Sequence, residues 1–252
     1  MKKIALVGCG MIGSYIAKSA AENKFADAAF VYDADPEKAK ALQGAHVLGE
    51  PAAVADTGAD LVIEAATAQA VHAIAPQVLK KTDLLVFSIT SLADDDFRES
   101  LREICRNHKT RLYIPHGAIL GLDGIFDGRS VLESVTIKTT KNPNNLGLKE
   151  PASGVLYDGP TRGACEEFPR NVNVHAAVAV AGIGFDRTHS LVVADPQTNQ
   201  MTHEIRVKGQ GLEWVISITS RAVGAVTGSY TPESAAMTVR RILASDYDIV
   251  LA

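Results

Sequence analysis

The chain has 252 residues, of which 46% are hydrophobic and 21% are charged, and its formal net charge at pH 7 is -4. These values are typical of a folded globular protein with one large or two modest domains, and they exclude a disordered chain. The acidic balance disfavours nucleic acid as a partner, and no apolar run is long enough to predict a membrane span.

The cysteines and the N-terminus bear on the cellular compartment. Cys9, Cys105 and Cys165 are odd in number and widely spaced, which matches neither a disulfide framework nor a zinc site. The apolar stretch near the N-terminus extends only from Ile4 to Val7, which is too short for the core of a signal peptide. We therefore expect a protein of the reducing cytoplasm, without a metal site.

Residues 1–114 alternate between short apolar runs and segments of helical periodicity. The expected strands cover residues 3–7, 28–32, 61–64, 84–88 and 111–114. The expected helices cover residues 11–21, 68–79 and 94–107, and a further one starts at Pro36. Strands that alternate with helices of this length pair in parallel through right-handed crossovers. The sequence therefore predicts an α/β domain over residues 1–114.

The pattern changes after Ile114, where turn-rich stretches at 115–128 and 141–163 separate alternating β-type runs. The elements expected here are strands at 131–140, 188–194, 202–208 and 212–218 and a helix at 173–181. They predict a second, α+β domain over residues 115–231, with a sheet covered by helices, for substrate binding and dimerisation. We expect the final helical segment, 232–252, to pack back on the first domain.

A glycine motif lies between the first strand and the first helix, where the chain reads GCGMIG from Gly8 to Gly13. This is the GxGxxG spacing of a Rossmann dinucleotide-binding domain, in the context that the motif requires. Gly8 permits the tight turn, Gly10 lets the backbone approach a pyrophosphate, and the helix beginning at Met11 and Ile12 presents free N–H groups. We therefore predict that residues 8–13 bind a dinucleotide.

Asp33 lies twenty residues beyond Gly13, at the end of the second strand. A carboxylate at this place can accept hydrogen bonds from both ribose hydroxyls, which disfavours a 2′-phosphate. No arginine immediately follows Asp33, so the sequence favours NAD over NADP as the cofactor, with NADP as the alternative. The other interpretation is that Asp33 caps a turn before Asp35 and Pro36.

A Rossmann domain does not identify a substrate, so evidence for the substrate has to come from the second half of the chain. Several motifs there occur in order: PHGAI from Pro115, FPRNVNV from Phe168, AGIGFDRT from Ala181, ADP from Ala194 and HEI from His203, together with Asp123. In sequence and order these motifs resemble the L-aspartate dehydrogenase family, and the resemblance extends over nearly the whole chain.

The resemblance implies an NAD-dependent amino-acid dehydrogenase. The implied reaction is the oxidative deamination of L-aspartate to oxaloacetate and ammonia through iminosuccinate, or the reverse amination, with NAD biosynthesis as a setting. The catalytic histidine of the family falls on His203, and its cofactor-contacting alanine and asparagine fall on Ala118 and Asn173. The resemblance also implies a homodimer.

The residues themselves are compatible with these roles. Deamination needs a group that moves protons near neutral pH, and imidazole has a suitable intrinsic pKa. Among seven histidines, His203 follows a turn-rich segment and begins a strand, while His175 and His189 are its nearest rivals. Asn173 starts a helix of small residues, so its alternative role is a helix N-cap.

A dicarboxylate substrate needs cationic or hydroxyl partners, because its charges are costly to desolvate without compensation. Lys141 and Arg170 are the expected substrate-binding residues, and Arg170 is alternatively a solvated surface residue. Thr67 and the stretches 88–91 and 231–234 depart from the family pattern. A related dehydrogenase of another amino or imino acid is therefore one alternative function, and a non-catalytic NAD-binding sensor is another.

Overall fold

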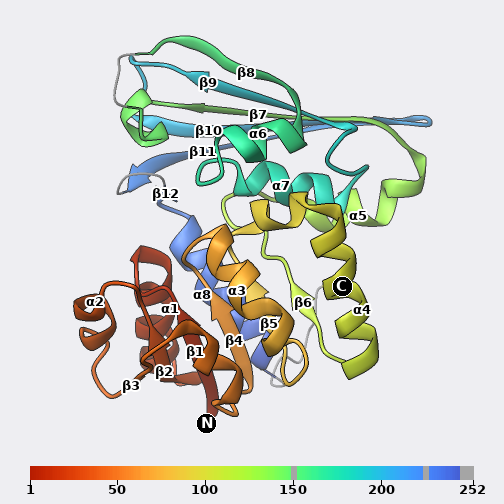
Figure 1. Ribbon diagram of the computed structural model, residues 1–252. Coiled ribbons are helices and arrows are strands. Elements are labelled where there is room, and N and C mark those ends of the chain that lie inside the picture. The colour runs from red at the N-terminus through yellow and green to blue at the C-terminus, as the bar shows by residue number, and fades with distance from the viewer. Residues whose placement is uncertain (149–151, 224–226, 245–252) are drawn as a thin grey trace. The chain divides into compact units, whose positions relative to one another are not determined.

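The computed structural model describes residues 1–148, 152–223 and 227–244 (Figure 1). The chain divides into two compact units, which we describe separately. Unit 1 comprises Met1–Phe87, Glu99–Pro115 and the residues from Pro232 onward, and unit 2 comprises Ser88–Arg98 and His116–Thr231. The segment Ser88–Arg98 therefore belongs to unit 2, whereas the sequence pattern predicts it as part of the first domain. Within the described ranges, no helix combines the length and the apolar character needed to cross a bilayer.

Unit 1 is built on a parallel six-stranded sheet with the strand order β3-β2-β1-β4-β5-β6. The strands are β1 Lys2–Val7, β2 Ala26–Tyr32, β3 His46–Val47, β4 Leu61–Glu64, β5 Leu84–Val86 and β6 Leu112–Tyr113. The α-helices are α1 Met11–Glu22, α2 Pro36–Lys40, α3 Ala68–Val78, α4 Asp95–His108 and α8 Thr231–Leu243, and the 3-10 helix is η1 Pro51–Asp56. The first residues of α4, up to Arg98, are assigned to unit 2. This strand order is that of the Rossmann fold, so the predicted fold of the first domain is confirmed.

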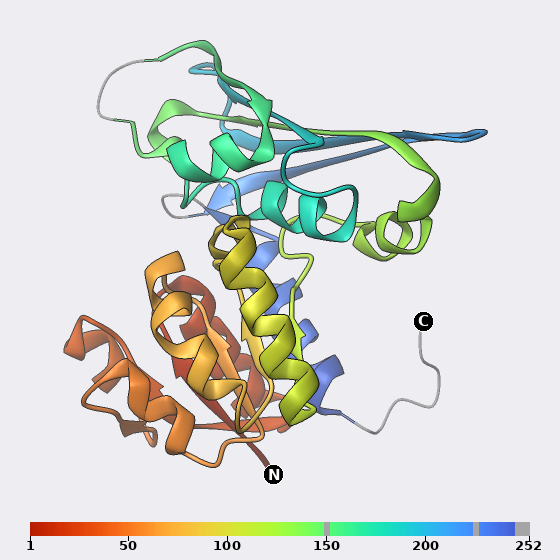
Figure 2. The ribbon, with the colours of Figure 1, turned by 45° about the vertical axis from the view of Figure 1, so that its right-hand side comes forward.

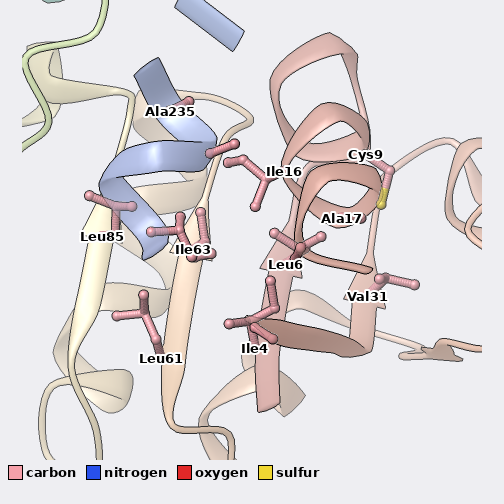
Figure 3. Close-up of a cluster of buried hydrophobic side chains, with 14 of the residues drawn as sticks. Ile4, Leu6, Cys9, Ile16, Ala17, Val31, Leu61, Ile63, Leu85 and Ala235 are labelled. Atoms are coloured by element: carbon pink, nitrogen blue, oxygen red, sulfur yellow. The ribbon is translucent and has the colours of Figure 1, made fainter. Parts of the chain in front are cut away.

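The core of unit 1 combines strand residues with small residues from two helices. Ile4, Leu6 and Ile63 of the central strands are fully buried, because a parallel sheet is covered on both faces. Ala235 of α8 packs in the same cluster, whose labelled side chains include those of α1 and β5 (Figure 3). Val239 of α8 also belongs to this cluster and is 0% exposed. The last described helix thus contributes to the core built by the first strands, and residues 245–252 of the expected helical segment lie outside the described residues.

Unit 2 is built on a mixed sheet with the strand order β12-β11-β10-β7-β9-β8. β7 pairs with β9 in parallel, and the other described pairings are antiparallel. The strands are β7 Leu132–Lys141, β8 Gly154–Pro160, β9 Thr188–Ala194, β10 Gln200–Gly209, β11 Leu212–Val223 and β12 Thr227–Gly228. The helices are α5 Leu122–Gly128, α6 Thr161–Glu167 and α7 Asn173–Ala181, with the 3-10 helices η2 Ile89–Ala93, η3 Arg129–Val131 and η4 Pro143–Leu146.

Helices α5, α6 and α7 lie on the same face of this sheet (Figures 1 and 2). The strand β7 shows the consequence, because Val135, Ile137, Thr139 and Lys141 alternate with more exposed residues and are all buried. The expected sheet covered by helices is confirmed. Its buried face carries polar as well as apolar side chains.

Three elements of unit 2, α5, β8 and α6, lie wholly or partly in stretches whose composition predicts turns. α5 falls within 115–128, and β8 and the start of α6 fall within 141–163. β8 is an edge strand, and it has no buried residue and no regular apolar alternation. A strand that buries little side-chain surface leaves little trace in hydrophobic periodicity, which explains why it was missed.

Candidate active site

The glycine turn of unit 1 is held by backbone packing at two of its three glycines. Gly8 has a φ of 100°, and a Cβ on it would lie 2.5 Å from the carbonyl oxygen of Ala65. A Cβ on Gly13 would lie 2.0 Å from the carbonyl oxygen of Gly8. Around a Cβ on Gly10, by contrast, no described residue other than its chain neighbours places a heavy atom within 4 Å. The space beside Gly10 is thus open to a ligand.

The N-terminus of α1 supplies unpaired amides beside this open space. The first intrahelical bond joins the Ser14 amide to the Gly10 carbonyl at 2.9 Å, so the amides of Met11, Ile12 and Gly13 precede it. The first turn of α1, which is described in full, contains no acidic side chain, and Met11 is 41% exposed. Partial positive charge and free N–H groups fit a diphosphate, so the turn suits the expected dinucleotide.

The carboxylate of Asp33 ties the end of β2 to the glycine turn. Oδ2 accepts a hydrogen bond of 2.7 Å from the Cys9 amide, and Oδ1 accepts one of 2.9 Å from the Asp35 amide. The turn contact that was the alternative role of Asp33 is therefore present. Each carboxylate oxygen has a second acceptor site, so the contact leaves capacity for ribose hydroxyls. The ribose role stays a prediction.

Cys9 is a packed residue of this turn. It is 4% exposed, and burial together with the Asp33 charge raises the pKa of its thiol to about 11. A thiol with a raised pKa is protonated near neutral pH and is a poor nucleophile.

The buried face of the unit 2 sheet brings two histidines together through one hydroxyl. Thr139 of β7 is paired in register with His203 of β10, and its Oγ1 lies 2.8 Å from Nδ1 of that ring. The same Oγ1 lies 2.6 Å from Nε2 of His175 on α7. His203 is 4% exposed and His175 is 0% exposed. His203 and its nearest rival thus belong to one buried cluster.

Burial governs the charge of this cluster. It lowers the pKa of His203 to about 3, with a smaller contribution from the positive charge of Lys141. Burial also lowers the pKa of His175 well below its ordinary value, with smaller contributions from His203 and Lys141. Both imidazoles are therefore neutral at neutral pH. His189, the other rival, is half-exposed and its Nε2 lies 2.7 Å from Oδ1 of Asp158.

The other expected residues of unit 2 lie in different environments. Lys141 ends β7 on the same face as Thr139, and burial lowers its pKa to about 8. Arg170 is exposed in the turn between α6 and α7. Asn173 is the first residue of α7 rather than its N-cap, and its Oδ1 accepts a 3.2 Å hydrogen bond from the Thr90 amide. Ala118 is 9% exposed in a turn before α5.

Comparison with known proteins identifies the family. Residues 126–242 match the family described as aspartate dehydrogenase, C-terminal, and residues 8–115 match that described as homoserine dehydrogenase, NAD binding domain. The L-aspartate dehydrogenase of Methanosarcina acetivorans is 37% identical over 230 residues, which cover 83% of this chain and 84% of that protein. The L-aspartate dehydrogenase of Archaeoglobus fulgidus is 35% identical over 241 residues, which cover 95% of each chain. The chain belongs to the L-aspartate dehydrogenase family.

A solved structure of an L-aspartate dehydrogenase family member has the same fold. The crystal structure of aspartate dehydrogenase from Thermotoga maritima matches with a TM-score of 0.81 and 25% identity, and the match covers 100% of both chains. The resemblance inferred from the sequence is thereby confirmed. The chain is an NAD(P)-dependent amino-acid dehydrogenase, and it uses NAD.

The three departures from the expected L-aspartate dehydrogenase pattern have local structural roles. Thr67 is the N-cap of α3, and its Oγ1 accepts a 3.2 Å hydrogen bond from an amide of the first turn. In the second departure, Thr90 Oγ1 donates to the Pro169 carbonyl at 3.0 Å. In the third, Glu233 accepts a 2.5 Å hydrogen bond from the Tyr15 hydroxyl within unit 1. Each of these three side chains thus makes a local hydrogen bond.

Three hydroxyl residues of the buried cluster were not found by sequence reasoning. They are Thr139 of β7, Ser190 of β9 and Thr161 of α6, and they are at most 1% exposed. The available signal was strand alternation, because Thr139 stands two residues from Ile137 in the inward-facing set of β7. A polar residue in a buried register is worth testing for a partner in any enzyme of the L-aspartate dehydrogenase family.

Proposed function

We propose that the chain catalyses the oxidation of L-aspartate by NAD to iminosuccinate, which water converts to oxaloacetate and ammonia, and that it also runs the reverse amination. In balanced form, L-aspartate, NAD⁺ and water give oxaloacetate, ammonium, NADH and a proton. The observation that carries the proposal is the buried, neutral His203 with Lys141 on the same sheet face. The relatives named L-aspartate dehydrogenase support the choice of substrate.

When bound, the dinucleotide supplies the acceptor for the hydride of the substrate Cα. The part of His203 is to move protons. Its Nδ1 is engaged by Thr139, so Nε2 is the nitrogen offered to substrate and water. As water attacks the imine carbon, the neutral imidazole accepts a hydrogen bond from that water at Nε2 and relays its proton toward the departing ammonia, so the ring, whose pKa is about 3, does not have to hold the proton as a stable cation.

Binding of the dicarboxylate falls to Lys141. Neutral pH is below the Lys141 pKa of about 8, so the side chain is a charged ammonium. Burial has already removed most of the hydration of this group. A substrate carboxylate that reaches it gains an ion pair in a weakly screened site. Arg170 is exposed, so its substrate role depends on the second carboxylate reaching the turn after α6.

Asn173 and Ala118 are assigned to the nicotinamide. Because the Asn173 Oδ1 accepts from the Thr90 amide, the Nδ2 of the same side chain is oriented as a donor, which suits a carboxamide oxygen. Ala118 offers a small side chain and backbone groups. Met11 and Ile12 hold the diphosphate through their amides, with Gly8, Gly10 and Gly13 shaping the turn, and Asp33 holds the ribose.

A spectrophotometric assay at mildly alkaline pH tests the reaction, with L-aspartate and NAD in one direction and oxaloacetate, ammonia and NADH in the other. Turnover in neither direction would defeat the proposal. A panel of other L-amino acids belongs in the same experiment, because preference for one of them would replace aspartate as the substrate. NADH binding without any turnover would indicate a sensor.

The role of His203 is tested by His203→Ala. We expect this variant to bind NADH normally but to lose turnover by about 10²-fold or more, because general acid–base catalysis contributes about 10²- to 10⁴-fold. His189→Ala is the matched control, since that half-exposed ring pairs with Asp158. Unchanged turnover of His203→Ala would remove His203 from the mechanism.

We further propose that the enzyme is a cytoplasmic homodimer and that its iminosuccinate serves NAD biosynthesis. The number and spacing of the cysteines, which match no disulfide framework, support the cytoplasmic location. The resemblance to the L-aspartate dehydrogenase family supports both the homodimer and the role in NAD biosynthesis. Analytical ultracentrifugation of the purified protein decides the oligomeric state, and a monomer at working concentrations would contradict it.

A further inference from the structure

We propose that a buried chain of hydroxyl and imidazole groups holds the proton of His203 on Nδ1 and keeps Nε2 as a free acceptor. The inference rests on the proposed catalytic role of His203. It assigns Thr139, His175, Ser190 and Thr161 as positioning residues, which act on the reaction through the tautomer of one ring.

The chain of groups runs from β10 across the sheet to α6. It starts at His203 Nδ1, which lies 2.8 Å from Thr139 Oγ1. The same Oγ1 lies 2.6 Å from His175 Nε2. From His175 Nδ1 it passes to Ser190 Oγ at 2.9 Å, and from there to Thr161 Oγ1 at 2.7 Å. It ends at the carbonyl oxygen of Thr188, which accepts from Thr161 Oγ1 at 3.0 Å. The five side chains from His203 to Thr161 are at most 4% exposed.

The terminal carbonyl sets the direction of every bond in this chain. A carbonyl oxygen only accepts, so the single hydroxyl proton of Thr161 points toward Thr188. Ser190 then donates to Thr161 and accepts from Nδ1–H of His175. His175 Nε2 accepts from Thr139, which in turn accepts from Nδ1–H of His203. This orientation makes five hydrogen bonds.

The opposite orientation makes one bond fewer. Thr161 would then donate to Ser190, each later bond would reverse, and His203 would carry its proton on Nε2. The contact from Thr161 to the Thr188 carbonyl would hold no proton, because a hydroxyl has only one. Buried polar groups favour the arrangement that pairs more of them, so the Nδ1–H tautomer prevails.

Both arrangements require neutral rings, and the surroundings provide them. Burial and the charge of Lys141, the charged group that acts on both rings, lower the pKa of His203 and of His175. A neutral imidazole has one donor and one acceptor nitrogen, which is what a one-directional chain needs. An Nε2 without a proton is the form that can take one from water.

The distinctive consequence concerns Thr161, which is three side chains away from His203. Thr161→Val removes the terminal donor and leaves the Ser190 proton without that acceptor. Ser190 then donates to His175, and we expect His203 to change from the Nδ1–H to the Nε2–H tautomer. The turnover number should fall by about 10²-fold, because the ring then presents a donor where an acceptor is needed.

The experiment is ¹⁵N nuclear magnetic resonance of histidine-labelled, full-length protein at neutral pH, with His203→Gln used to assign the signals. In the unmodified protein, His203 Nδ1 should give a pyrrole-type shift and Nε2 a pyridine-type shift. In Thr161→Val the two nitrogens should exchange these shifts, and in Thr161→Ser the shifts should be those of the unmodified protein. Ser190→Ala is a second variant in which we expect the same exchange of shifts.

Thr188→Val is the matched control. Its buried Oγ1 has no hydrogen-bond partner among the described residues, so loss of this hydroxyl should leave the tautomer unchanged while the carbonyl remains. A proton on His203 Nε2 in the unmodified protein would overturn the proposal. A spectrum of Thr161→Val identical to that of the unmodified protein would also overturn it. The spectra need no turnover, so a failure of aspartate oxidation would sink the proposed function and leave this test standing.

Discussion

At the scale of single residues, Lys141 and Asp33 illustrate two ways of preparing a charge for a ligand. Lys141 is 3% exposed, and burial alone is the cause of its lowered pKa. Asp33 is half-buried, and both of its oxygens already accept backbone hydrogen bonds. Burial therefore disfavours the charged form of the lysine, whereas two backbone amides hold the carboxylate of the aspartate in place.

The pKa of Lys141 predicts a pH dependence for binding of a dicarboxylate. Below pH 8 the ammonium is charged and binds; above pH 8 it is neutral. We expect the dissociation constant of succinate, which has no amine to titrate, to be constant below about pH 8 and then to rise about tenfold per pH unit. Calorimetric titration measures this, and Lys138→Met, on the exposed face of the same strand, is the control variant.

The same shift predicts a change in stability. Because the folded-state pKa of about 8 is below the model value of 10.5, the unfolded chain binds more protons between these values, and stability rises with pH across that window. We expect Lys141→Met to be more stable than the unmodified protein at pH 7 by about 3 kcal/mol. The gain should vanish above about pH 10.5; an equal gain at all pH values would contradict the assigned cause.

Asp33→Ala tests the ribose contact. We expect the Michaelis constant for NAD to rise at least tenfold, because the carboxylate offers two acceptors to the ribose, and discrimination against NADP to weaken. Asp35→Ala is the control, since its side chain caps α2 through the Glu37 amide. An unaltered constant in Asp33→Ala would leave the residue only its turn contacts.

At the scale of elements, the glycine turn separates a structural requirement from a binding requirement. A Cβ on Gly13 meets the Gly8 carbonyl, whereas a Cβ on Gly10 meets open space at a φ of −72° that any residue adopts. We expect Gly13→Ala to lower the stability of unit 1 by a few kcal/mol. Gly10→Ala should fold normally but bind NADH at least tenfold more weakly, since its methyl group occupies the pyrophosphate space.

Thermal unfolding and fluorescence titration of NADH check the two variants side by side. Normal NADH affinity in Gly10→Ala would place the diphosphate elsewhere. Normal stability of Gly13→Ala would mean that α1 shifts to accommodate the methyl group.

The same scale explains what the sequence could and could not predict. Apart from β3 and η1, the elements of unit 1 were predicted, as were the strands β7, β9, β10 and β11, because most of these elements bury a periodic apolar set. The edge strand β8 and the short helix α6 carry weaker periodicity. His203 was predicted from a family motif, but Thr139 and Ser190 could not be assigned, because their significance comes from the pairing of β7 with β9 and β10. Register is a tertiary property that local patterns do not contain.

At the scale of the whole molecule, the first and the last described segments of the chain both belong to unit 1. β1 supplies Ile4 and Leu6 to a cluster to which α8 adds Ala235 and Val239, so the two ends of the described chain stabilise one core (Figure 3). Every residue of this cluster belongs to unit 1. The polar cluster around His203 belongs to unit 2. The glycine turn and the polar cluster around His203 thus belong to different units.

Val239→Asp tests this division in the full chain. The Val239 side chain is 0% exposed, so a carboxylate at this position is not hydrated. We therefore expect the free energy of unfolding of unit 1 to fall by several kcal/mol. Hydrogen exchange should accelerate in β1 and β4, and NADH affinity should fall. The exchange of β7 and β10 should stay unchanged, because local opening follows the core that a segment belongs to. Arg241→Asp, an exposed position on the same helix, serves as the control, and equal acceleration in both units would show that they unfold as one.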